Sequence, residues 1–237
     1  MKDYIDLQMD FLLSKINVTI IFFLLIVIML SSLYNAQVME GYAYLDGFRK
    51  DFQNDFLNES FMMIEFILVF ISIYIGMVLG GHKNQALMIY SVYSKKTKYK
   101  YLMARLVTGI WMIAILLICV LLTIILIVYY FTPYVIDHII YIKVSSLLFL
   151  QLIQYFVLTL TLLTIINHFL FGLLPLLIFW AVEITSYNMP KDLKNITEKI
   201  MVDINGYYYQ EKSILIFLIL LHFLIISYII VMQKKDC

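Results

Sequence analysis

The stretch FMMIEFILVFISIYIGMVLGG, Phe61–Gly81, followed by HKNQALMIYSVYSKKTKYKYLMAR, His82–Arg105, decides the fold of this chain. The first part is mostly apolar and has the roughly 20 residues that a helix needs to cross a bilayer. The second part carries six basic residues and no acidic residue. Because positively charged loops stay in the cytoplasm, the pair predicts a membrane span that ends in a cytoplasmic loop.

Five more apolar runs lie on either side of this one. Of the 237 residues 63% are hydrophobic and 14% charged, whereas soluble domains are about a quarter charged. We therefore predict an all-α integral membrane protein, a single transmembrane domain over residues 1–237. Its six predicted spans are Ile16–Tyr34, Phe61–Gly81, Leu102–Phe131, Val144–Ile166, Phe169–Thr185 and Ser213–Met232.

Two breaks divide the later runs. Asn167 and His168 are the only polar residues between the fourth and fifth runs, so a tight turn is expected there. Pro175 is expected to kink the fifth span, where other groups must satisfy the carbonyl that it frees.

Two segments outside the runs have helical amphipathic patterns. Residues 1–15 place Ile5, Met9 and Leu12 on one face and predict an elbow helix in the headgroup plane, with a frayed terminus as the alternative. Residues 187–209 predict a second amphipathic helix on the outer surface. We expect the chain to lie in the plasma membrane of the cell. The basic loop then predicts that both termini are cytoplasmic.

Four polar residues within the predicted spans are candidate intramembrane sites, because a charge in the bilayer centre costs about 2.5–3.5 kcal/mol. Glu65 lies near the outer end of its span, and the favoured interpretation is that it reaches the headgroups. Gln151 and Gln154 are expected to face another helix, and His222 to form an interhelical hydrogen bond.

Small residues at four-residue spacing, Ser72, Gly76 and Gly80, predict close packing of the second span against a neighbour. The sequence has no phosphate-binding loop G-x-x-x-x-G-K-[ST] and no H-E-x-x-H motif, and Cys119 and Cys237 lack metal-ligand spacing. We therefore expect no enzyme activity, cofactor or metal in this chain. The net charge of +1 gives no reason to expect a nucleic-acid partner.

Residues Gly80–Lys95, with the basic patch and Tyr101–Arg105 behind them, resemble the coupling-helix region of type-2 ABC exporter permeases. The layout also resembles that family over the whole length: an amphipathic elbow, six spans, a cytoplasmic coupling helix after span two, and outer helices before span six. The resemblance implies a coupling region over residues 82–98. Its expected contacts with the ATPase are Lys83, Ala86, Leu87, Ile89, Tyr90 and Tyr93.

The resemblance also implies partners. A separate ATP-binding cassette subunit would bind ATP and Mg²⁺, and a second permease copy or paralogue would meet spans one and five. The expected cargo is amphipathic or hydrophobic, with peptides foremost. The alternatives are a polytopic membrane protein outside the ABC class, such as a self-standing immunity factor or a scaffold, and a secondary transporter, which would need inverted repeats.

Overall fold

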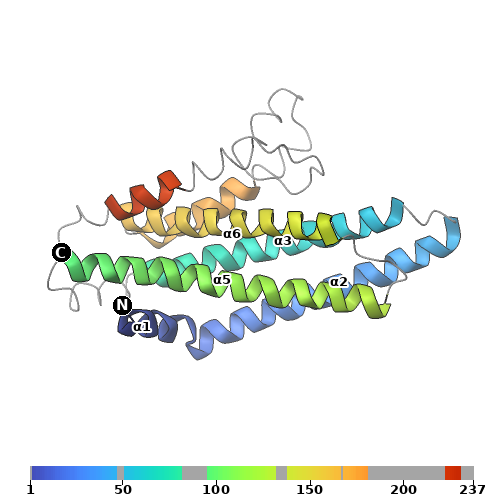
Figure 1. Ribbon diagram of the computed structural model, residues 1–237, viewed down its shortest axis with the longest axis horizontal. Coiled ribbons are helices and arrows are strands. Elements are labelled where there is room, and N and C mark those ends of the chain that lie inside the picture. The colour runs from blue at the N-terminus through green and yellow to red at the C-terminus, as the bar shows by residue number, and fades with distance from the viewer. Residues whose placement is uncertain are drawn as a thin grey trace, which may run out of the picture.

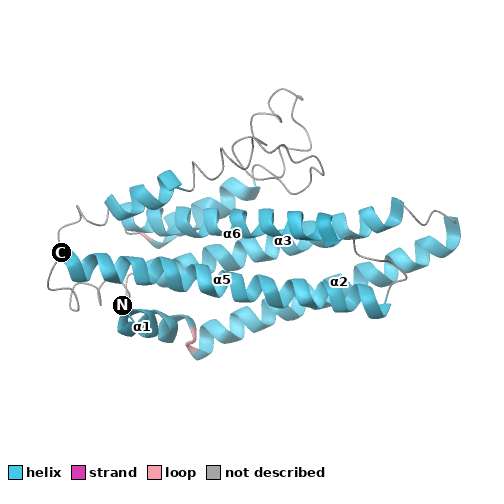
Figure 2. Cartoon of the chain, in the orientation of Figure 1, coloured by secondary structure: helices cyan, strands magenta, loops and turns pink. Residues whose placement is uncertain are grey.

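A computed structural model describes residues 2–46, 51–81, 95–131, 138–166, 168–180 and 222–230. Every regular element in these ranges is a helix, which confirms the all-α prediction for them (Figure 2). Residues 174–180 and 222–230 are helical as well. The labelled elements are α1 (Lys2–Leu12), α2 (Lys15–Asp46), α3 (Asp51–Gly80), α5 (Lys95–Phe131), α6 (His138–Ile166) and the 3₁₀ helix η1 (Phe169–Leu173).

Three helices in the described ranges are long and apolar enough to cross a membrane: Lys15–Gln37 in α2, Lys98–Phe131 in α5 and Ser145–Leu163 in α6. Large apolar side chains point outward from them, and Phe23 of α2 and Trp111 of α5 are each 64% exposed. Lipid tails solvate such side chains as well as a protein core does. The chain is therefore a multi-pass membrane protein, with further shorter apolar helices at Ile64–Gly80 and Leu170–Trp180.

The helices are longer than the apolar runs that predicted them. α2 continues past Tyr34 to Asp46, and α5 begins at Lys95 rather than at Leu102. An apolar run marks only the part of a helix that lies at lipid depth, whereas backbone hydrogen bonds continue through the polar turns beyond it. The first turns of α5 thus contain much of the basic patch in helical form.

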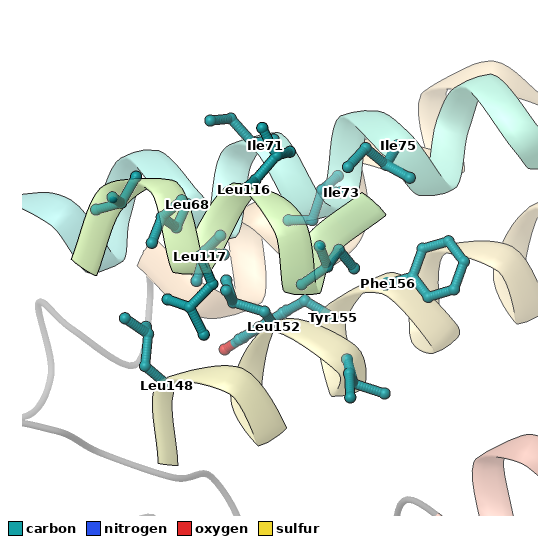
Figure 3. Packing of buried hydrophobic residues seen from close by; sticks show 14 of the residues in the cluster. Leu68, Ile71, Ile73, Ile75, Leu116, Leu117, Leu148, Leu152, Tyr155 and Phe156 are labelled. Carbon is teal, nitrogen blue, oxygen red and sulfur yellow. The ribbon is translucent and has the colours of Figure 1, made fainter. Parts of the chain in front are cut away.

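α3 and α6 form the core of the bundle, whereas α2 lies at its edge (Figure 1). In the apolar stretch of α6 72% of the residues are buried, against 17% in that of α2. A helix that is buried on most sides must pack against several neighbours, and α6 contacts α3, α5 and η1. Figure 3 shows part of this core, with Leu68 and Ile73 of α3, Leu116 and Leu117 of α5, and Leu148, Leu152 and Tyr155 of α6.

The small residues of α3 face α6, which confirms the predicted close packing. A Cβ added to Gly76 would lie 2.9 Å from the Cβ of Thr159, and one added to Gly80 would lie 3.0 Å from Cδ1 of Leu163. The Ser72 hydroxyl donates a hydrogen bond of 2.5 Å to the carbonyl of Leu152.

A second close approach joins α5 to α6. A Cβ on Gly109 would lie 2.0 Å from Cζ of Phe156, inside the volume of the ring. Phe156 is fully buried: its ring lies against Gly109 of α5, and its backbone carbonyl lies close to Gly76 of α3. The spacing pattern in the sequence did not single out Gly109, because it has no small partner three or four residues away.

The predicted turn after α6 is present. α6 ends at Ile166, and His168 is extended, with its Nδ1 accepting a hydrogen bond from the Leu170 amide. Pro175 does not interrupt a helix, because it lies in the first turn of the helical residues 174–180, where no partner for its missing N–H is needed. The Phe171 carbonyl, four residues before it, accepts from the Leu174 amide instead.

The N-terminal segment predicted to be amphipathic is a helix: α1 packs against the beginning of α5 (Figure 1). It buries Gln8 and Leu12 fully, and the partly buried Tyr4 packs against the core beside them. Of the predicted face only Leu12 is fully buried, and Ile5 and Met9 do not pack against the core cluster, so the predicted face was rotated. The reason is that Tyr4 meets an aromatic partner, the ring of Tyr101 in α5, edge to face at 5.7 Å.

Candidate functional site

The expected ATPase contacts Lys83, Ala86, Leu87, Ile89, Tyr90 and Tyr93 lie outside the described residues, as do 187–209, the predicted outer helix. Of the coupling region only residues 95–98 are described, and they form the first turn of α5. The chain between α3 and α5 therefore starts and ends at the end of the bundle where α1 packs, which we refer to below as the α1 end.

Glu65 and Gln151 form a buried polar pair between α3 and α6. Gln151 Nε2 donates a hydrogen bond of 2.5 Å to Oε1 of Glu65, and the two side chains are 3% and 1% exposed, respectively. The interpretation that Glu65 reaches the headgroups is therefore wrong, because α6 covers it. The expectation that Gln151 faces another helix is confirmed.

Gln154 and His222 differ in their surroundings. Gln154 is buried, one helical turn after Gln151, and its Oε1 has no hydrogen-bond partner among the described residues. Oε1 of Gln151 is likewise without one there. His222 is exposed at the start of the helical residues 222–230, so it faces away from the described helices rather than into them.

A third polar contact links the elbow to the bundle. After α1 the chain turns at Leu13 and Ser14, and Asn17 of α2 then reaches back: its Nδ2 donates to the Phe11 carbonyl at 2.7 Å. The Oδ1 of the same Asn17 accepts from the Tyr74 hydroxyl of α3, also at 2.7 Å. One amide side chain thus connects the end of α1, the start of α2 and the middle of α3.

A fourth cluster surrounds Arg105 at the α1 end. The arginine is 0% exposed, and none of its three side-chain nitrogens has a hydrogen-bond partner among the described residues. Its guanidinium carbon lies 4.9 Å from the centre of the Tyr101 ring, a cation–π distance. Tyr228 lies close enough for its hydroxyl to interact electrostatically with Arg105, but the two form no hydrogen bond of ordinary geometry.

The sequence had placed Arg105 among the charges of a solvated loop, and it gave no indication of Tyr228 or Gln8. Depth along a helix can be read from composition, but the direction in which a side chain points depends on which helix lies opposite. Only Lys98, Tyr101 and Arg105, spaced three and four residues apart, could have suggested a shared helix face.

Apart from the exposed His222, these polar groups are amides, hydroxyls, one carboxyl group and one guanidinium, and they lie where helices pack together. Among the described residues no three His, Cys, Asp or Glu side chains are grouped so that they could hold a metal ion. What these clusters can do is set the angle and register of helices and, at Arg105, attract an anion.

Comparison with known proteins gives no further guide: no protein-family model, no curated protein and no solved structure matches this chain.

Proposed function

We propose that the chain is the permease subunit of an ABC exporter. The observation that supports this most directly is the elbow, an N-terminal helix that turns at Leu13–Ser14 into α2 and docks on the start of α5. That position puts the elbow at the end of the bundle where α3 ends and α5 begins. The ATPase contacts are expected in residues 82–94, which join these two helices in the sequence. An elbow and a coupling segment at one end are what a permease needs if a motor protein is to move its spans.

The proposal includes six spans with both termini in the cytoplasm. The helices α2, α3, α5 and α6, the stretch Leu170–Trp180 and the residues around 222–230 would be these spans. The basic first turns of α5 would then lie on the cytoplasmic side, in agreement with the charge bias of membrane proteins. The α1 end would be the cytoplasmic end.

The mechanism would be mechanical. An ATP-binding cassette subunit would receive residues around Ala86–Tyr93, and closure of its ATP-bound dimer would push on the ends of α3 and α5. α3 is held to α6 by the contacts at Gly76 and Gly80, so a push on α3 would move the two helices together. A second permease would complete the path for an amphipathic or hydrophobic cargo, foremost a peptide.

The test is co-purification. A gene beside this one is expected to encode an ATPase with a phosphate-binding loop, and the tagged full-length chain should co-purify with that ATPase when the two are expressed together. Ala86→Asp, Ile89→Asp and Tyr90→Asp should each reduce the recovered ATPase by about tenfold or more, as substitutions at the centre of an interface do.

Tyr99→Asp is the matched control, because Tyr99 is an exposed tyrosine on α5 close to the same end. It should leave the recovery of the ATPase unchanged, and size-exclusion profiles should show that all four variants are folded. If no ATPase co-purifies, or if the three substitutions leave its binding unchanged, the proposal is wrong and the self-standing immunity factor or scaffold takes its place.

A further inference from the structure

Arg105 belongs to a polar stripe along one face of α5. Lys98, Tyr101, Arg105 and Thr108 follow one another at intervals of three and four residues, so they share one side of the helix. All four are buried, with exposed fractions of 8%, 0%, 0% and 1%. A membrane helix thus turns two cationic side chains towards protein instead of towards water.

The charge of Arg105 is not neutralised by the described neighbours. The three acidic residues of α1, the helix that packs on this part of α5, are all exposed: Asp3, Asp6 and Asp10. They lie opposite the buried face of Tyr4, Gln8 and Leu12 and therefore point away from α5. The Tyr101 ring supplies a cation–π contact but no acceptor for the guanidinium N–H groups.

A buried guanidinium that has no anionic partner among the described residues is strongly unfavourable, because the charge loses its hydration and gains no counterion there. The hydroxyls of Tyr228 and of Thr108, which is one helical turn after Arg105 on α5, are also buried and have no hydrogen-bond partner among the described residues. An anion beside Arg105 would accept from the guanidinium, and these hydroxyls are the nearest candidates for a second donor. Guanidinium groups match phosphate best, because two parallel N–H groups meet two oxygens of it.

The depth of Arg105 indicates where such a phosphate would come from. The apolar stretch Lys98–Phe131 has 34 residues, about 51 Å of helix, whereas the hydrocarbon core is about 30 Å thick. If the excess is shared between the ends, about 10 Å projects at each. Arg105 lies seven residues after Lys98, about 10 Å along the helix, and so at the boundary between headgroups and hydrocarbon.

We propose that Arg105, with Thr108 and Tyr228, forms a binding site for a phosphate group, supplied by the headgroup of an anionic phospholipid in the adjacent leaflet. α1 closes the site in this structure, since its Tyr4 packs on Tyr101 and Tyr101 on Arg105. The headgroup enters when α1 moves about the turn at Leu13–Ser14. The inference requires only that the chain lies in a membrane, and it is independent of any transport activity.

The test is thermal unfolding of the full-length protein, purified in a maltoside detergent that contains no phosphate. The protein is titrated separately with short-chain phosphatidylglycerol, with phosphatidylcholine and with inorganic phosphate. Phosphatidylglycerol should raise the Tm of the wild-type protein, and native mass spectrometry should show the bound lipid. Arg105→Met should weaken the binding of phosphatidylglycerol by about tenfold or more, the size expected for charge-assisted hydrogen bonds.

The variants separate a specific site from general attraction. Lys100→Met removes an exposed cation from the same helix, and it should leave the binding constant within about twofold of the wild-type value. Without any phosphate, Arg105→Met should unfold at the same temperature as the wild-type protein or a higher one, since it removes an unpaired buried charge. If Arg105→Met does not fold, Arg105→Lys serves instead and should keep part of the response, because it retains the charge but not the paired N–H groups.

The remaining outcomes also decide the matter. A rise in Tm with inorganic phosphate that depends on Arg105 supports the site and assigns it to free phosphate. A rise with phosphatidylglycerol alone assigns it to lipid. If neither compound raises the Tm, or if Arg105→Met and Lys100→Met lose the response equally, the site does not exist.

Discussion

Glu65 illustrates what a single residue in a membrane helix can and cannot reveal. Its position in the sequence gives its depth, near the outer end of a span, and depth alone favoured a side chain that reaches the headgroups. In the structure the Glu65 side chain points towards α6 instead, where Nε2 of Gln151 donates a hydrogen bond to it. Arg105 is a second case: the sequence shows it only as part of the basic stretch, and its burial depends on the helices around it.

The pair between Glu65 and Gln151 leads to a prediction for stability. Gln151→Leu should lower the free energy of unfolding by about 1–3 kcal/mol, because it removes a donor from a buried carboxyl group. Glu65→Leu should have a cost of similar size, since it leaves the amide of Gln151 without this acceptor.

The double variant Glu65→Leu/Gln151→Leu should be more stable than the sum of the two single effects implies, since it leaves neither partner unsatisfied. Thermal unfolding of the four proteins in one detergent measures this coupling. Ser146→Ala, at an exposed position on α6, is the control and should change little. Strictly additive single effects would contradict the pairing.

Whole elements were easier to predict than single contacts. The elbow helix, the span of α6 and the break before His168 followed from composition and periodicity, and the spacing of Ser72, Gly76 and Gly80 correctly predicted a close helix contact. The ends of α2 and α5 did not follow, because polar turns continue a helix beyond the lipid without any apolar pattern.

The attachment of the elbow leads to a prediction for the element as a whole. Asn17→Ala removes both the bond to the Phe11 carbonyl and the bond from Tyr74. With these two contacts gone, α1 should leave α5 more often, and hydrogen exchange of the amides of residues 2–12 should become faster by about fivefold or more, equivalent to about 1 kcal/mol.

Thr19→Ala is the matched control for the elbow. The Thr19 hydroxyl bonds only to the Lys15 carbonyl of its own helix and is exposed, so its loss should leave exchange in α1 unchanged. Equal exchange rates in the wild-type protein and Asn17→Ala would show that the amide does not hold the elbow.

At the scale of the whole molecule, the sequence was sufficient to predict a helical membrane protein but not to predict how its helices pack against one another. An apolar run of bilayer length indicates that lipid surrounds the helix, and the exposed apolar side chains of α2 and α5 agree with this. The deep burial of α6 could not be predicted from its composition, which resembles that of the other spans. Gly109 and Phe156 show why: their contact depends on how α5 and α6 dock against each other, which the sequence pattern does not reveal.

The transport proposal depends on the segment between α3 and α5, and cross-linking tests it most directly. The full-length chain, with Cys119 and Cys237 replaced by serine and a single cysteine at Ala86, is expressed in cells with the neighbouring ATPase and treated with a photoactivatable thiol reagent. We predict a cross-link to the ATPase whose yield changes when ATP is bound. A cysteine at Ala86 that reacts freely with a water-soluble reagent from outside the cell, and forms no such cross-link, would contradict both the orientation and the coupling role.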